Sequence, residues 1–202
     1  MKYVLLLSFL LPLLCRASDD SAILDELNFA RTRPQEYAAI LDVTMSTIPW
    51  ADQRCVAEAE AFLRRQHPLP PLQSATGLVM SARDQAADQA ASGEIGHRGS
   101  DGASPWARMA RWGQWTGRAG EAISYGYSDA RSIVSTLIVD QGVPNHGHRH
   151  NIFCRDFRVA GSACAPHPRY GAMCVIDFAG GFVEKGEKVA MVADAWRAIG
   201  EY

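Results

Sequence analysis

The chain has 202 residues, of which 48% are hydrophobic and 21% charged, and its formal net charge is −2. This length suits one well-buried core rather than several domains. Arginines are scattered among acidic residues and lysine is nearly confined to the C-terminal tail. A basic face for nucleic-acid binding is therefore not expected.

The first 17 residues are typical of a signal peptide. Lys2 precedes an apolar run over residues 3–14, and Ala17 supplies a small residue at the expected cleavage position. The run is shorter than the roughly 20 residues of a membrane span. We therefore expect export to the periplasm or the medium, no transmembrane segment, and one mature domain over residues 18–202 with a formal charge of −4. Cys15 also permits a lipidated N-terminus, although Leu14 is not the small residue expected before a lipidated cysteine.

Helical patterns dominate the first half of the mature chain. Asp20 and Ser21 are capping-type residues before an apolar stripe, Pro34 fits the first turn of the next helix, and Gly93 marks the end of a long amphipathic helix. The predicted helices cover residues 21–31, 34–41, 52–66 and 75–91.

Strand patterns are confined to the second half. A glycine-rich turn at 96–102 and a short helix at 104–112 precede a strand at 120–127. A helix capped by Ser128 and Asp129 then runs to about residue 141, and a short helix follows at 148–153. Two β-like runs, 159–165 and 170–179, form an antiparallel hairpin, and the tail at 185–202 has an amphipathic helical stripe. The order predicts an α+β fold, as an α–β–α sandwich with a small antiparallel sheet.

The mature part contains four cysteines, an even number that favours disulfides in an exported protein. Cys164 and Cys174 lie on the two strands of the predicted hairpin, so a cross-strand bridge is expected between them. That pairing leaves Cys55 for Cys154. Four cysteines in the reduced state are the alternative.

Three separated segments place a titratable residue beside glycine, which permits close approach of the backbone. They contain His97 after Gly96, Glu121 after Gly120, and His148 after Gly147. A histidine or glutamate next to glycine is more often an exposed loop residue, so spacing alone does not establish a shared site.

The order of these motifs resembles the bacterial branch of the CAP (SCP-like) superfamily, which includes cysteine-rich secretory, antigen 5 and pathogenesis-related proteins. The motifs are Gly96-His97, Ser100-Asp101-Gly102, Gly120-Glu121-x-Ile123 and Gly147-His148-Arg149-x-Asn151-Ile152. The resemblance covers nearly the whole mature chain and implies a three-layer α–β–α sandwich with a central cleft.

The resemblance also implies a cleft site of two histidines and two acids. Carried over by position, the histidines are His97 and His148, the first acid is Glu121, and the second is Asp140 on the helix before the Gly-His motif. Two positions depart from the family pattern: Ala122 replaces an asparagine, and Asp140 replaces a longer glutamate. The shorter side chain predicts that the Asp140 carboxylate falls short of the cleft or reaches it through water.

Two imidazoles are good ligands for zinc or another divalent metal ion. His97 and His148 are therefore the candidate metal ligands, and Glu121 and Asp140 the candidate catalytic residues. Glu121 could ligate the metal, fix a histidine tautomer, or act as a base on water. Neither an HExxH helix nor a Gly-x-Ser-x-Gly elbow occurs in the sequence. The alternative is a hydrogen-bonded network that only stabilises the cleft.

The neighbouring residues are expected to have other roles. His146 and His150 alternate with His148, but the resemblance places them at the start of a helix, where they would be exposed rather than ligating. Asn151 is expected to secure the backbone of its own turn. The tryptophans at 106, 112 and 115 are expected in the core, with a binding lip over the cleft as the other interpretation.

The sequence predicts a monomeric, secreted or periplasmic CAP-domain protein whose cleft binds a divalent metal ion and a small apolar or peptide ligand. The alternative is a metal-assisted hydrolase that acts on extracellular or envelope peptides or esters. The sequence does not choose between an enzyme and a binding module, because a fold does not determine an activity.

Overall fold

The computed structural model describes residues 18–186. The predicted signal peptide lies outside the described residues, as does the predicted tail helix except for Lys185 and Gly186, which follow the last strand. In chain order the elements are α1 Ser18–Thr32, α2 Pro34–Ser46, α3 Gln53–Arg65, β1 Gln73–Ser74, α4 Thr76–Ser92, α5 Pro105–Trp112, β2 Gly113–Tyr125, α6 Ala130–Val139, a 3₁₀ turn Pro144–His146, α7 Gly147–Ile152, β3 Val159–His167 and β4 Gly171–Glu184.

The strands form one sheet in the order β1-β3-β4-β2. Strands β3 and β4 form the predicted antiparallel hairpin, and β2 pairs with β4 in the antiparallel sense. The short β1 pairs with β3 in parallel. The sheet is therefore mixed, not purely antiparallel as predicted, because two residues before α4 add a parallel edge.

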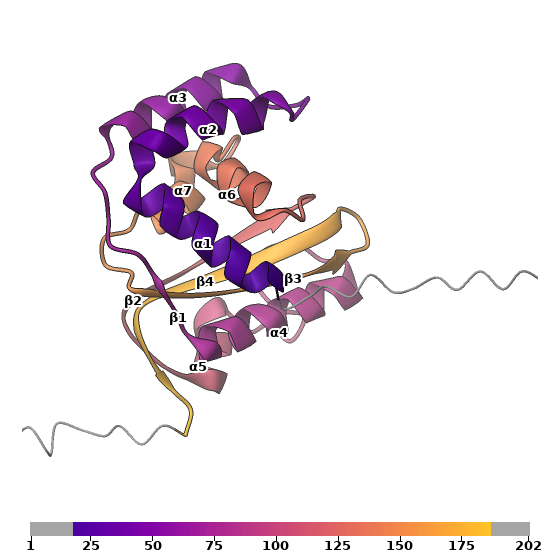
Figure 1. Ribbon diagram of the computed structural model, residues 1–202. Helices are drawn as coiled ribbons and strands as arrows, with labels where there is room; N and C mark the ends of the chain where they lie inside the picture. Colours follow the sequence, from indigo (N-terminus) through magenta and orange to yellow (C-terminus); the bar gives the residue numbers. More distant parts are fainter. Residues whose placement is uncertain (1–17, 187–202) are drawn as a thin grey trace, which may run out of the picture.

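The helices cover both faces of this sheet in three layers, as the sequence predicted. Helices α1, α2, α3, α6 and α7 lie on one side of the sheet, and α4 and α5 lie on the other (Figure 1). No helix within residues 18–186 has the length and hydropathy that crossing a bilayer requires.

Alternation along the strands divides the core between the two faces. On β4, Cys174, Ile176 and Phe178 belong to the larger apolar cluster under the five-helix layer. Met173 and Val175 pack with Ala82 and Ala86 of α4 on the opposite face. Odd-numbered residues in this part of β4 therefore face α4.

Two helix ends follow signals that were predicted from the sequence, Asp129 at the start of α6 and Gly93 at the end of α4. Asp129 caps α6 through a side-chain oxygen that accepts a backbone N–H. Asp52 and Ser104 cap α3 and α5 in the same way, although the sequence predicted both residues inside those helices. Gly93 ends α4 with φ 71°, a left-handed conformation that suits glycine. Helix α1 begins at Ser18, so the prediction that Asp20 and Ser21 cap it was wrong. Acidic residues are also favourable inside the first turn of a helix, where the backbone dipole attracts negative charge.

A buried arginine connects the helical layer to the segment after α7. The Arg31 side chain donates to the carbonyl oxygens of Ile152, Cys154 and Pro70 at 2.6, 3.1 and 3.1 Å. Burial lowers the pKa of Arg31 to about 10. Buried carbonyl oxygens need a hydrogen-bond partner, and the guanidinium supplies one to Ile152, the last residue of α7.

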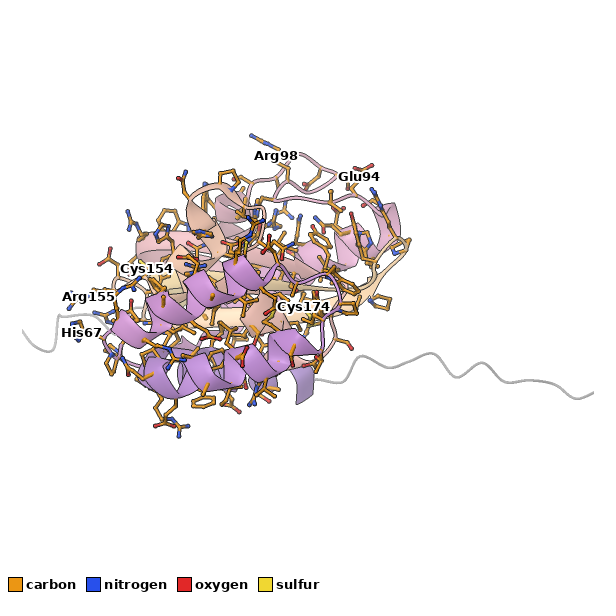
Figure 2. All side chains as sticks on the ribbon, turned by 90° about the horizontal axis from the view of Figure 1, so that it is seen from above. His67, Glu94, Arg98, Cys154, Arg155 and Cys174 are labelled. Carbon is orange, nitrogen blue, oxygen red and sulfur yellow. A yellow bond between two sulfur atoms is a disulfide. The ribbon has the colours of Figure 1, made fainter. Side chains whose placement is uncertain are left out.

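The predicted hairpin disulfide is present. Cys164 and Cys174 are direct cross-strand partners and are bonded to each other. Cys55 and Cys154 are free thiols, so the expected second bridge is not formed. The sulfur of Cys154 lies 4.0 Å from Arg118 Nη1. Figure 2 shows Cys154, His67 and Arg155 at the same end of the molecule.

Candidate functional site

The first site pair joins the glycine-rich turn to strand β2. His97 Nδ1 lies 2.7 Å from Glu121 Oε1. The Glu121 side chain is 1% exposed and the His97 side chain 52% exposed. An ionised carboxylate only accepts hydrogen bonds, so Nδ1 carries the hydrogen. The other ring nitrogen, Nε2, has no protein partner within residues 18–186.

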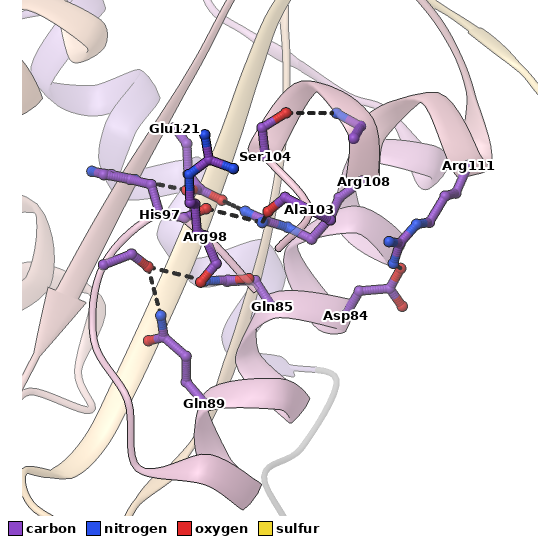
Figure 3. A network of polar contacts seen from close by, with 12 residues as sticks. Asp84, Gln85, Gln89, His97, Arg98, Ala103, Ser104, Arg108, Arg111 and Glu121 are labelled. Carbon is purple, nitrogen blue, oxygen red and sulfur yellow. Dashed lines mark hydrogen bonds and ion pairs between the residues drawn. The ribbon is translucent and has the colours of Figure 1, made fainter. Parts of the chain in front are cut away.

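A buried arginine holds this pair in place. Arg108 on α5 donates through Nη2 to Glu121 Oε2, and its Nη1 donates to the carbonyl oxygen of His97 at 3.0 Å (Figure 3). The Arg108 and Glu121 side chains are 2% and 1% exposed. One guanidinium therefore compensates the buried carboxylate and anchors the turn that carries the histidine.

Helix α4 supports the same turn from below. Gln89 Nε2 and Gln85 Nε2 donate to the Gly96 carbonyl oxygen at 2.6 and 3.0 Å (Figure 3). The Gly96 N–H donates to the Tyr125 hydroxyl at 2.9 Å. Burial raises the pKa of Tyr125, which keeps it a neutral phenol. These contacts fix the turn independently of the histidine side chain.

The second pair lies between α6 and α7. His148 Nδ1 is 2.7 Å from Asp140 Oδ1, and the Asp140 side chain is 1% exposed. Asp140 Oδ2 accepts the backbone N–H groups of His148 and Arg149 at 2.9 and 3.3 Å. His148 Nε2 has no protein partner in the described part of the chain.

Asp140 was expected to fall short of the cleft or to reach it through water, and in the structure its carboxylate contacts His148 directly. Asp140 ends α6 in a left-handed conformation, with φ 53° and ψ 41°. An aspartate tolerates this conformation better than most side chains, and it turns the carboxylate toward the start of α7. The shorter side chain therefore reaches the imidazole directly, without water.

The two pairs are linked through strand β2, although they do not merge. Asn151 Nδ2 on α7 donates to the Glu121 carbonyl oxygen at 2.9 Å. A Cβ on Gly120 would lie 2.9 Å from Asn151 Oδ1 and 3.0 Å from Phe157 Cζ, so glycine permits this approach. Asn151 thus joins two elements, whereas the sequence assigned it to its own turn.

The predicted meeting of His97, Glu121 and His148 in one cluster is realised only in part. The structure brings His97 to Glu121 and His148 to Asp140. Within residues 18–186, no group of three or more histidine, cysteine, aspartate or glutamate side chains is arranged to hold a metal ion. Glu121 does not join the two histidines as a third ligand.

The neighbouring histidines lie outside both pairs. His150 is exposed, as expected. His146 is 39% exposed and its Nε2 lies 3.8 Å from Glu58 Oε2. Ser100 Oγ donates to Asp88, so it is not directed at His97.

The three tryptophans do not share one environment. Trp106 is 45% exposed, so its predicted place in the core was wrong. Trp112 Nε1 donates to Asp84 Oδ2 at 2.8 Å, and Trp115 packs against the apolar cluster around Met109. None of these contacts involves His97 or His148.

Two buried residues of the site were not predicted from the sequence. Arg108 compensates Glu121, and Asp177 on β4 is the register partner of Glu121 and is fully buried. The available signal for Asp177 was its place in the apolar run Val175-Ile176-Asp177-Phe178, because an acid is rarely buried without a function or a partner.

The arrangement suits ligand binding through imidazole. In metal sites a histidine commonly donates one ring N–H to a carboxylate, which fixes the ring and leaves the other nitrogen for the ion. His97 and His148 both have this arrangement. Two such ligands would leave the remaining coordination positions to water or to a bound molecule.

The three layers define an α–β–α sandwich domain. The family model for the cysteine-rich secretory protein family, CAP, matches residues 58–178. This match spans more than half of the chain, and the chain belongs to the CAP family.

Solved structures of bacterial proteins are similar to this chain at low sequence identity. An outer surface protein from Borrelia burgdorferi is 18% identical, with a TM-score of 0.47, over 55% of this chain and 78% of that chain. An extracellular SCP-domain protein from Bacillus anthracis is 19% identical over 55% and 34% of the two chains, with a TM-score of 0.44. A cysteine-rich secretory protein from Staphylococcus aureus is 10% identical over 82% and 40%, with a TM-score of 0.46. The chain thus spans well under half of the last two proteins. No curated protein matches it.

Proposed function

We propose that this protein is an exported CAP-domain binding module in which His97 and His148 hold a divalent metal ion through Nε2. One observation carries the proposal: each histidine has Nδ1 on a buried carboxylate, and its Nε2 has no protein partner among residues 18–186. When bound, zinc or a similar ion would supply a Lewis-acidic centre that anchors an electron-rich group of a ligand.

The two carboxylates act as positioning residues in this proposal. Glu121 uses one oxygen for His97 and the other for Arg108. Asp140 uses its oxygens for the His148 ring and two backbone N–H groups. A general base needs a free oxygen within reach of the proton it removes. This geometry supports a binding module rather than the hydrolase that the sequence left open.

A separate cavity supports an apolar ligand. It has a volume of about 230 Å³ and lies between α1, α4 and the sheet. Its lining is mainly aliphatic, with Leu24, Leu27, Val79 and Ile176 among its residues. The volume is below the usual range for ligand pockets, so the cavity suits only a short hydrocarbon chain. The cavity lies apart from the histidine pairs, so it supplies a second binding place rather than the cleft predicted from the sequence.

Two observations support export. The Cys164–Cys174 disulfide suits an oxidising compartment. The family to which the chain belongs is described as secretory. Together with the apolar run at residues 3–14, they favour the periplasm or the medium.

Zinc titration of the full chain, purified without a histidine tag, tests the metal site. We expect His97→Ala and His148→Ala each to weaken zinc binding and the double variant to abolish it. His150→Ala is the matched control, because His150 lies on the same short helix as His148 and is exposed. A double variant that keeps full zinc stoichiometry would exclude the proposed site.

The positioning role of the carboxylates has its own measurement. Glu121→Gln and Asp140→Asn should weaken zinc binding by about 10- to 100-fold, as expected for partners of a metal-ligating histidine. A broad ester and peptide hydrolysis assay completes the test. Turnover that depends on His97 and His148 would contradict the binding-module interpretation.

A further inference from the structure

A row of three residues crosses the sheet and ends at Glu121, the partner of His97. Gly161 on β3, Asp177 on β4 and Glu121 on β2 are register partners, so their side-chain positions share one face. A Cβ on Gly161 would lie 2.2 Å from the backbone nitrogen of Val79. Helix α4 therefore packs directly on this row and closes it from solvent.

Asp177 in this row and three side chains of α4 and α5 carry buried polar atoms without a hydrogen-bond partner among residues 18–186. Six buried side-chain polar atoms lack a hydrogen-bond partner within residues 18–186, and five of them belong to Ser81, Gln85, Arg108 and Asp177. Both carboxyl oxygens of Asp177 are among the five, and Asp177 is 0% exposed. Most buried polar groups in proteins are paired, so this concentration calls for an explanation.

The charges around Asp177 explain why its carboxyl oxygens are unpaired. Glu121 faces it from β2, Arg108 from α5 and the polar Ser81 from α4, while His97 contacts the far side of Glu121. Arg108 is the cation of this group, and it is already committed to Glu121. An ionised Asp177 would be a second buried anion without a cation of its own, which is strongly unfavourable.

We propose that Asp177 is a positioning residue that keeps its proton at neutral pH and donates it in a hydrogen bond to the Glu121 carboxylate. The neutral acid stabilises Glu121 as the anion, and the anion holds His97 with hydrogen on Nδ1 and a lone pair on Nε2. The consequence for ligand binding by His97 rests on the proposed function. The protonation of Asp177 does not.

The direction of the pKa shift agrees with this geometry. Burial, followed by the negative charge of Glu121, raises the pKa of Asp177 well above its usual range, and Ser81 and Arg108 oppose the rise. A raised pKa in the folded state means that folding takes up a proton between the unfolded and folded pKa values. Stability is then fully present below the unfolded pKa and is lost as the pH rises through the folded pKa.

Two variants of the full chain test the proton directly. Difference infrared spectroscopy at pH 7 should show the carbonyl stretch of a protonated carboxylic acid, and Asp177→Asn should remove it. Asp156→Asn, which changes an exposed acid, should leave the band unchanged. Absence of the band in the wild type, or its survival in Asp177→Asn, would overturn the proposal.

Stability gives a second test that does not need a metal. Asp177→Asn replaces a neutral acid by a neutral amide of similar size, so its melting temperature relative to the wild type should rise as the pH increases from about 4 to 8. A difference that is constant over this range would show that Asp177 takes up no proton on folding, against the proposal.

The positioning role is measured at His97. Ring ¹⁵N shifts should show the Nδ1–H tautomer in the wild type and in Asp177→Asn, whose amide can still donate to Glu121. In Asp177→Ala, the Nδ1–H population of His97 should fall while that of His148 stays unchanged. If His97 keeps its tautomer in Asp177→Ala, the positioning role is wrong. The wild type could also bind no zinc while the infrared band, the pH dependence of the melting temperature and the His97 tautomer all behave as expected. That result would count against the proposed function alone.

Discussion

The two carboxylate–histidine pairs have the same 2.7 Å contact but are built differently. Glu121 lies 24 residues from His97 and depends on the buried Arg108 from a third element. Asp140 lies eight residues from His148 and is held by the backbone at the start of α7. One pair is a product of tertiary packing, and the other is a product of a local helix cap.

This difference decides how each pair should fail. The His97–Glu121 pair loses its compensating cation when Arg108 on α5 is replaced. The loss is costly because the remaining buried carboxylate has no access to water. A pair held by backbone N–H groups depends on the conformation of one turn. The two histidines should therefore respond to separate substitutions.

The largest effect is expected at Arg108. Arg108→Met leaves Glu121 buried and uncompensated, which should lower the free energy of unfolding by about 3–5 kcal/mol. Arg111→Met is the control on the same helix, because the half-exposed Arg111 contacts Asp101 at the surface and should contribute at most about 1 kcal/mol. Urea unfolding measures the loss in free energy of unfolding for both variants. Equal losses would contradict the importance of the buried Arg108–Glu121 pair.

A smaller loss is expected at Asp140. Asp140→Ala removes the acceptor of two backbone N–H groups and places alanine in a left-handed conformation, with a combined loss of about 1–3 kcal/mol. Asp129→Ala, at the exposed cap of α6, should cost about 1 kcal/mol. If thermal or urea unfolding ranks Asp129 above Asp140, the cap at α7 is not the main support of this turn.

Whether the two pairs are independent can be measured from the ring ¹⁵N shifts of the histidines, a readout that does not rely on a stability difference. Glu121→Gln should alter the ring ¹⁵N shifts of His97 alone, and Asp140→Asn those of His148 alone, because each carboxylate contacts one imidazole. The hydrogen bond from Asn151 to the Glu121 carbonyl oxygen links the two sides. A response of both histidines to either substitution would show that the pairs are coupled through it.

The smallest effect is expected at Glu58. Hydrogen bonds from Arg149 lower the pKa of Glu58, so its contribution is present above the unfolded pKa and is lost as the pH falls. The side chain is 49% exposed, and Glu58→Gln should therefore cost less than about 1 kcal/mol at pH 7. The loss measured by urea unfolding should shrink as the pH falls through the folded pKa of Glu58. A loss that does not change with pH would show that it comes from packing and not from charge.

The sequence predicted the four residues of the two pairs better than it predicted how they pair. His97, Glu121 and His148 stood out because each adjoins a glycine. Asp140 was assigned only through the resemblance to the CAP superfamily, which places the second acid on the helix before the Gly-His motif. Their partners could not be assigned, since pairing depends on strand register and on a left-handed turn that no residue pattern marks. The same limit explains why Asn151 was assigned to the wrong element.

Buried charge was the harder part of the site to predict. Arg31 and Arg108 lie among polar and apolar residues like ordinary surface arginines in the sequence, yet both are buried. Their partners include backbone carbonyls 39 to 126 residues away for Arg31. Such contacts form only when distant loops meet, so composition and periodicity give no sign of them.

The position of β2 gives Asn151 a further consequence. In residues 18–186, β2 is an edge of the sheet, with β4 on one side only. Open strand edges invite pairing with another chain and hence aggregation. The Asn151 side chain occupies the Glu121 carbonyl on this strand, and α7 lies against it. The short helix that supplies His148 therefore also blocks strand addition, and its loss would expose the protein to self-association.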